Sequence, residues 1–260
     1  RLRTCRAPMG GDGKKGGGVK RKYWGDASSG RRNVFKVLCP DALITSIMGP
    51  RGTTKDQIQD DTGCRLVFSN RDEYFPGTQY RTLAIYGDDP GAIAAVLERV
   101  IDRIVECGAH EQYSPKWEGD FRGKESDEYV LRALISGKMS GAVIGTRGVN
   151  IQAIRDENNA KVFIEKNSCN GHQMMRVIAA ADGLRTALAR INECVQTETE
   201  AEDFPQWAAV RSFTAEEAAA CLGKGKGGKK GKAPPVEEWE EIPPPSGKGK
   251  SKGKEKGEEE

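Results

Sequence analysis

The chain has 260 residues, of which 37% are apolar and 30% are charged, and its formal net charge is +3. No apolar run approaches the ~18 residues of a membrane-spanning helix. No His/Asp/Ser set, Cys/His set or Walker lysine stands out, so we expect neither an enzyme nor a cofactor. Apolar periodicity is confined to roughly the middle two-thirds of the chain, and the ends cannot bury enough surface to offset their ordering entropy.

The N-terminal stretch is basic, with ten Lys or Arg against two Asp in residues 1–33. We expect residues 1–32 to form a disordered basic arm of a kind that suits phosphate backbones. A solvated arm without a binding role is an equally good interpretation. The chain opens at Arg1 rather than at Met, so targeting from that end is not judged. Lys14–Lys22 is a weak nuclear-import candidate, and the expected location is the nucleus, the cytoplasm or both.

Residues 33–107 follow a strand–helix–helix–strand–strand–helix pattern. The first helix is expected to end at Met48, and the second to stop near Gly63, which tolerates the left-handed conformation. A long amphipathic helix closes the stretch. Its expected signals are Asp89 as cap, Pro90 in the first turn and Gly108 beyond the end. The remaining expectations are strands at Val34–Leu38, Arg65–Phe68 and Arg81–Tyr86, and Asp41 as the cap of the first helix.

Residues 108–127 are rich in Gly, Ser and charged residues and are expected to form a linker, with Tyr113 and Trp117 docking locally. As a flexible chain of 20 residues, this linker would span about 25 Å.

Residues 128–197 repeat the pattern of 33–107 at an offset of 96. Gly49, Arg51 and Gly52 fall on Gly145, Arg147 and Gly148. After a shorter loop the offset becomes 95, which aligns Arg81 with Arg176, and in the last helix it becomes 91. The expected elements are strands at Tyr129–Ile135, Lys161–Glu165 and Arg176–Ala180, with helices ending at Ile144 and near Asn159.

The C-terminal part differs in character. Residues 198–222 are acidic, and Thr214–Glu217 forms a capping box before a short helix. Residues 223–260 are expected to be a disordered Gly/Lys/Glu/Pro-rich tail, in which the Pro-flanked segment around Trp239 is a candidate docking peptide. The seven Cys are scattered without a CxxC pair, and neither His110 nor His172 has metal-ligand spacing. We therefore expect reduced thiols and no metal site.

The segment Gly141–Gly148, followed by Ile151 and Ile154, resembles the signature of KH domains, and Gly49–Gly52 with Ile58 resembles a second copy. The order β-α-α-β-β-α resembles the eukaryotic form of this fold, as in poly(C)-binding and Nova-like proteins. The implied fold class is α+β, with two tandem domains in which a three-stranded antiparallel sheet packs on three helices. The resemblance covers about 145 of the 260 residues.

The resemblance implies single-stranded RNA as the partner, with single-stranded DNA as a further ligand. KH domains clamp about four nucleotides with a GxxG loop. It further implies a preference for pyrimidine-rich mRNA and a role in post-transcriptional regulation. In the first copy the implied RNA-binding residues are Ile44, Thr45, Met48, Gly49, Pro50, Arg51, Gly52, Arg65 and Arg81. In the second copy they are Ser140, Gly141, Ile144, Gly145, Thr146, Arg147, Gly148, Lys161 and Arg176.

The first copy departs from the family pattern at three positions. Pro50 lacks an N–H donor and stiffens the loop, Lys55 stands where Ile151 lies in the second copy, and Thr45 replaces Gly141. These departures put RNA binding by the first copy in doubt. The alternative hypothesis for the whole chain is a protein-interaction scaffold, with protein partners bound through the helix in 198–222 and the Pro/Trp tail.

Overall fold

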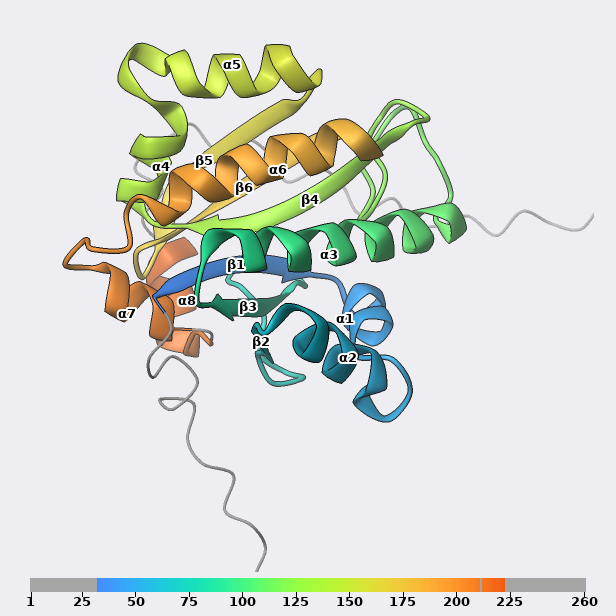
Figure 1. The fold of residues 1–260 in the computed structure, drawn as a ribbon, viewed down its shortest axis with the longest axis horizontal. Coiled ribbons are helices and arrows are strands. Elements are labelled where there is room, and N and C mark those ends of the chain that lie inside the picture. Colours follow the sequence, from blue (N-terminus) through green and yellow to red (C-terminus); the bar gives the residue numbers. More distant parts are fainter. Residues whose placement is uncertain (1–31, 211, 223–260) are drawn as a thin grey trace, which may run out of the picture. The chain divides into compact units, whose positions relative to one another are not determined.

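The computed structural model describes residues 32–210 and 212–222, so the predicted tail and, Arg32 apart, the predicted basic arm lie outside the described residues. The structure confirms the predicted α+β class with the order β-α-α-β-β-α twice (Figure 1). The first repeat contains β1 (Asn33–Cys39), α1 (Asp41–Met48), α2 (Thr53–Thr62), β2 (Arg65–Phe68), β3 (Arg81–Gly87) and α3 (Pro90–His110). The second repeat contains β4 (Glu128–Ile135), α4 (Gly137–Ile144), α5 (Val149–Asn158), β5 (Lys161–Cys169), β6 (His172–Ala180) and α6 (Ala181–Gln196).

The ends of the helices show where local sequence signals hold and where they fail. Asp89 caps α3 by accepting a hydrogen bond from the backbone N–H of Ala92, as predicted. Asp41 does not cap α1, because the cap position is Pro40 and Asp41 is already the first helical residue. Gly108 does not end α3, which continues to His110. Its missing side chain instead leaves room for Tyr129, whose ring would lie 3.0 Å from an added Cβ.

The two repeats share one six-stranded sheet of order β2-β3-β1-β4-β6-β5. They join where β1 and β4 pair antiparallel, with Lys36 opposite Leu134, Val37 opposite Ala133 and Leu38 opposite Arg132. The repeat offset of 96 relates Lys36 to Arg132 and Leu38 to Leu134, so it converts the first of these pairs into the last. The junction therefore has the symmetry of an isologous dimer interface, with its pseudo-twofold axis at Val37 and Ala133.

Helices cover one face of this sheet, the helix face. The strands send alternate side chains to it, including Phe35, Val37, Leu131 and Ala133, all of which are buried. The long helices α3 and α6 pack against each other over the junction (Figure 1). Arg185 on α6 pairs with Asp102 on α3 at 2.7 Å, and the Asn192 side chain donates to the carbonyl of Pro90 at 2.9 Å. The two repeats therefore share a single core on this face.

The opposite face of the sheet, the outer face, carries two buried cations related by the pseudo-twofold axis. Lys36 is fully buried and Arg132 is 7% exposed. The Lys36 ammonium donates to the carbonyls of Trp207 and Val210 and lies 2.9 Å from the His172 ring nitrogen. A buried charge is tolerated when hydrogen-bond acceptors surround it, and here the C-terminal segment supplies most of them.

The C-terminal segment, residues 204–210 and 212–222, covers part of the outer face. Its helices are α7 (Phe204–Ala209) and α8 (Ala215–Leu222), of which only α8 was predicted. Phe213 lies between the repeats, with ring centroids 5.2 Å from Phe75 and 5.3 Å from His172. Thr214 and Glu217 form the predicted capping box. The segment therefore fastens the first repeat to the second.

A disulfide ties the end of this segment to the second repeat. Cys169 in β5 bonds to Cys221 in α8, with their Cα atoms 5.2 Å apart. The prediction of reduced thiols is therefore wrong for this pair. The two residues are 52 positions apart in the chain, so no short cysteine motif in the sequence indicates the bond. Cys39, Cys107 and Cys194 carry free thiols.

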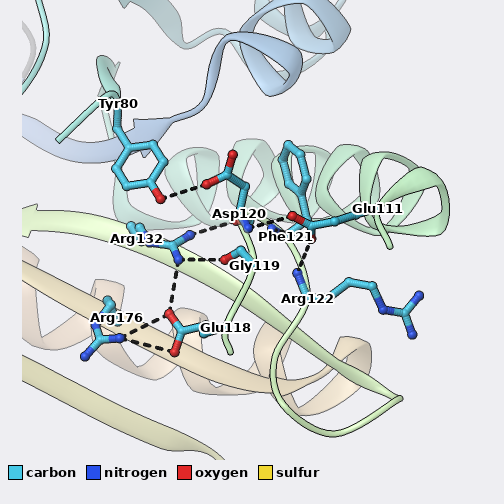
Figure 2. A network of polar contacts seen from close by, with 9 residues as sticks. All are labelled: Tyr80, Glu111, Glu118, Gly119, Asp120, Phe121, Arg122, Arg132 and Arg176. Atoms are coloured by element: carbon cyan, nitrogen blue, oxygen red, sulfur yellow. Dashed lines mark hydrogen bonds and ion pairs between the residues drawn. The ribbon is translucent and has the colours of Figure 1, made fainter. Parts of the chain in front are cut away.

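The segment between the repeats, residues 111–127, is folded against the domains rather than acting as the flexible linker of the sequence analysis (Figure 2). The Glu111 carboxylate accepts backbone N–H bonds from Asp120, Phe121 and Arg122 at 2.7–2.9 Å. Arg132 donates to the carbonyls of Gly119 and Asp120 at 2.9 and 2.7 Å. This segment therefore surrounds Arg132 with acceptors, as the C-terminal segment does for Lys36.

The environment of His172 predicts acid sensitivity. Burial, followed by the nearby Lys36 ammonium, lowers the pKa of His172 from 6.5 to about 3. The unfolded chain takes up a proton near pH 6.5, but the folded protein does not until the pH approaches 3. The stability from neutral His172 is thus complete above pH 6.5 and is lost as the pH falls. We expect the free energy of unfolding, measured with denaturant, to drop by up to ~1.4 kcal/mol per pH unit below that point.

The control uses the other histidine. His172→Gln should lower stability at neutral pH and flatten the pH dependence, whereas His110→Gln, at an exposed position, should leave the dependence intact. Measurements between about pH 7 and 5 avoid most carboxylate titration. A wild-type protein of constant stability across that range would contradict the assignment.

Candidate nucleic-acid interface

The two GxxG loops have the same backbone conformation. Each joins two helices through a 3₁₀ turn, Pro50–Gly52 in the first repeat and Thr146–Gly148 in the second. Arg51 has φ 55 and ψ 17, and Arg147 has φ 57 and ψ 20. Positive φ is uncommon for a residue with a side chain. Both arginines are exposed, so the turn holds a guanidinium out toward solvent in each repeat.

The first glycine of each loop is required by geometry. Gly49 has φ 66 and ψ −179, and Gly145 has φ 70 and ψ 174. This region of backbone space is essentially restricted to glycine. A Cβ on Gly49 would lie 2.0 Å from the Thr54 hydroxyl, and one on Gly145 would lie 2.6 Å from the Asn150 side chain. The loop is therefore closed tightly against the start of the following helix.

A groove of about 1330 Å³ runs beside the loop of the first repeat. Its walls come from α1, the loop, α2 and the edge strand β2. Within the described part of the chain, none of its cations Arg51, Lys55, Arg65 and Arg71 forms an ion pair. Ile44, Thr45, Met48, Gly49 and Gly52, all predicted site residues, line the same groove. Such a groove joins positive charge to an apolar wall.

Arg81 lies at the floor of this groove with its side chain 12% exposed. One terminal nitrogen donates to the carbonyl of Ser69 at 2.5 Å, and the other lies 3.7 Å from the Asp41 carboxylate. The buried Nε of Arg81 has no hydrogen-bond partner among the described residues. This guanidinium is therefore held in place, and its charge is only partly compensated.

The two strand cations predicted for the second repeat, Lys161 and Arg176, are paired with carboxylates instead. Lys161 contacts the carboxylates of Glu125 and Glu128 at 2.7 and 2.6 Å, and these bonds raise the pKa of Lys161. Arg176 contacts both oxygens of Glu118 at 3.1 and 3.2 Å (Figure 2). All three carboxylates belong to the stretch around the start of β4. A phosphate would have to compete with them for these cations.

The alignment of Arg81 with Arg176 is wrong. In the sheet Arg81 lies opposite Cys39 of β1, whereas Arg176 lies opposite Arg132 of β4. The second-repeat residue in the place of Arg81 is Gln173, opposite Ile135. The shift of three residues turns the side chain to the other face, because strand side chains alternate. Arg176 therefore lies on the outer face, with its guanidinium 5.3 Å from the Phe163 ring centroid.

The other predicted residues of the second repeat lie along α4 and its loop. Ser140 is buried, whereas Gly141, Ile144 and Thr146 are exposed and Gly145 and Gly148 are partly exposed. In the first repeat Pro50 is exposed in the loop. The sequence analysis missed Arg71, although a cation in a polar loop before a strand gives a recognisable signal.

In the described part of the chain no group of three or more His, Cys, Asp or Glu could hold a metal ion, and no helix is long and apolar enough to cross a membrane.

The loop geometry predicts that Gly145→Ala destabilises the second repeat. The new Cβ would meet Asn150 and force a glycine-only conformation, which costs about 1–3 kcal/mol. Gly137→Ala is the matched control, because a Cβ there meets nothing within 4 Å. Thermal unfolding should show a lower Tm for Gly145→Ala alone. Equal Tm values for Gly145→Ala and Gly137→Ala would show that the loop accommodates the new Cβ without a loss of stability.

Comparison with known proteins identifies the repeats. A model of the KH domain family matches residues 34–102 and 130–193. RNA-binding protein Pasilla of Drosophila melanogaster is 28% identical over 132 residues, which cover 51% of this chain and 16% of Pasilla. RNA-binding protein Nova-2 of Homo sapiens is 20% identical over 149 residues, which cover 56% of this chain and 30% of Nova-2. The chain thus spans less than a third of either relative.

Among solved structures, Dim2p from Pyrococcus horikoshii OT3 is 17% identical, covers 68% of this chain and 98% of its own, and has a TM-score of 0.24. The two matched ranges of the family model take up just over half of the 260 residues. They coincide with the two repeats and their GxxG loops, and the chain therefore belongs to the KH domain family, with two KH domains in tandem.

Proposed function

We propose that this chain binds single-stranded RNA through both of its KH domains. The observation that carries the proposal is the shared geometry of the two GxxG loops, each with an exposed arginine at positive φ. In each loop the next helix, α2 or α5, begins immediately after the second glycine. The N–H of its first residue, Thr53 or Val149, donates back to the 3₁₀ turn, and the N–H groups that follow in the first turn of the helix favour an anion. Glycines let the RNA backbone approach them closely.

The first repeat is the stronger binder in this proposal, despite Pro50 and Lys55. Proline removes one N–H donor, but Lys55 lines the groove and adds a positive charge. Of its five groove cations only Arg81 forms an ion pair within the described residues, whereas Lys161 of the second repeat is held by two carboxylates. Electrostatic attraction to phosphates dominates nucleic-acid affinity. We therefore assign more of the affinity to the first repeat.

The finer assignment is a preference for pyrimidine-rich mRNA and a role in post-transcriptional regulation, in the nucleus, the cytoplasm or both. The names of Pasilla and Nova-2 as RNA-binding proteins support an RNA partner. Arg81 supports base recognition, since a guanidinium fixed in the groove floor can donate to acceptors on a base edge. Crosslinking in cells followed by sequencing of the bound RNA tests the base preference and the target class.

Acidic residues in the loops should abolish binding without unfolding the domains, because an aspartate repels the phosphate that the loop holds. We expect Thr146→Asp with Arg147→Asp to remove RNA binding by the second repeat, and Pro50→Asp with Arg51→Asp to remove it by the first. Affinity for short single-stranded RNA measures the loss, and thermal unfolding measures integrity.

Thr186→Asp with Arg190→Asp is the matched control. It introduces the same charges at exposed positions of α6 that line neither the groove of the first repeat nor the pocket beside the second loop. Its affinity should stay close to that of the wild type. Unchanged RNA affinity in both loop variants, with protein partners still captured, would favour the scaffold hypothesis instead.

The shared sheet sets the geometry of two-site binding. β2 and β5 are opposite edges of the six strands, about 24 Å apart at ~4.8 Å per strand spacing. The antiparallel pairing of β1 with β4 also relates the two GxxG loops by the pseudo-twofold axis, so RNA strands bound at the two loops run in opposite directions. One RNA that binds at both loops must cross the sheet and reverse its direction.

We therefore expect a threshold in RNA length between two pyrimidine sites. Short spacers should give the affinity of one site, and longer spacers should add up to ~100-fold through effective concentration. Binding isotherms over a series of spacer lengths measure the threshold. The gain should disappear in either loop variant. A gain that is already present with the shortest spacers would contradict the rigid arrangement.

A further inference from the structure

A second hollow adjoins the groove of the first repeat. It has a volume of about 930 Å³ and shares two lining residues with the groove, Asp41 and Tyr74. Its far side is formed by the turn before β3 and by Asp120 of the segment between the repeats. A strand of RNA in the groove would therefore reach this hollow at the Asp41–Tyr74 boundary.

The two spaces differ in charge. The groove is lined by five Lys or Arg and by three Asp, whereas the hollow is lined by Asp41 and Asp120 and by no Lys or Arg. Phosphates are therefore drawn to the groove and repelled from the hollow. The part of an RNA that projects from the backbone into the hollow therefore has to be uncharged and has to offer hydrogen-bond donors to the carboxylates.

Tyr74 and Asp120 are placed to meet such a group. The Tyr74 side chain is 38% exposed at the boundary, and its backbone is fixed by a bridge to Arg81. One oxygen of Asp120 accepts a hydrogen bond from the Tyr80 hydroxyl at 2.8 Å. Arg132 holds the Asp120 carbonyl at 2.7 Å (Figure 2). The other carboxylate oxygen of Asp120 has no hydrogen bond from a described residue.

We propose that this hollow binds one further nucleobase, stacked on Tyr74, and that it prefers adenine or cytosine to uracil. Both bases carry an exocyclic amino group, which donates to a carboxylate, whereas uracil presents a carbonyl acceptor at the corresponding position. Aromatic side chains stack on bases splayed out of single-stranded RNA. The proposal rests on RNA binding by the first repeat and extends its site beyond the four nucleotides of the clamp.

The test uses the full chain with Thr146→Asp and Arg147→Asp, so that binding reports the first repeat. The probes are a pyrimidine tetranucleotide and pentanucleotides that add adenine, cytosine or uracil at the 5′ or the 3′ end. We expect adenine or cytosine at one end to raise the affinity about tenfold over the tetranucleotide. Uracil at the same end should give a clearly smaller gain.

Tyr74→Ala should reduce the ratio of pentanucleotide to tetranucleotide affinity to about one. Tyr113→Ala is the matched control, because Tyr113 is 39% exposed and lines neither space; it should keep the wild-type ratio. Tetranucleotide binding without a gain at either end would overturn this inference alone. A gain equal for uracil, or one that survives Tyr74→Ala, would also overturn it. No binding of any probe would overturn RNA binding by the first repeat itself.

Discussion

The pairing of β1 with β4 is the constraint on which the rest of the structure depends. It merges two small sheets into one and brings two cations, Lys36 and Arg132, into buried positions on the outer face. An uncompensated buried charge costs several kcal/mol, so acceptors must reach both positions. The chain supplies them from the two segments outside the repeats. Glu118, Gly119 and Asp120 provide acceptors for Arg132, and Trp207 and Val210 provide them for Lys36.

The same symmetry extends to the neighbours of these cations. Tyr80 lies under Arg132, with the guanidinium 4.9 Å from its ring centroid, and His172 lies beside Lys36. Tyr80 comes just before β3 and His172 begins β6, so the two occupy corresponding places. The chemistry differs, because a neutral imidazole can accept from an ammonium whereas a phenol ring offers its π face. The two repeats thus keep the same arrangement of strands around the pseudo-twofold axis, while each repeat contacts its buried cation with a different side chain.

The proposed RNA-binding function would therefore use an unequal pair of sites joined by one sheet. The loops are nearly identical in backbone, yet carboxylates in and before β4 hold Lys161 and Arg176 of the second repeat. The departures from the family pattern suggest a weak first repeat when loop residues are considered alone. The charges around the groove favour a stronger first repeat, since Arg51, Lys55, Arg65 and Arg71 line this open groove. Affinity for a polyanion depends on the net field as well as on the motif.

The sequence by itself determined the fold class, the element order, the GxxG loops and the helix ends at Gly63 and Asn159, because these depend on local periodicity and on left-handed residues. It placed Arg176 wrongly, because a register within a hairpin depends on the length of the loop, and an odd shift reverses the face. It could not place the Cys169–Cys221 bond or the buried Lys36. Only the tertiary structure decided these features, since contacts between segments 52 or 171 positions apart leave no local pattern in the chain.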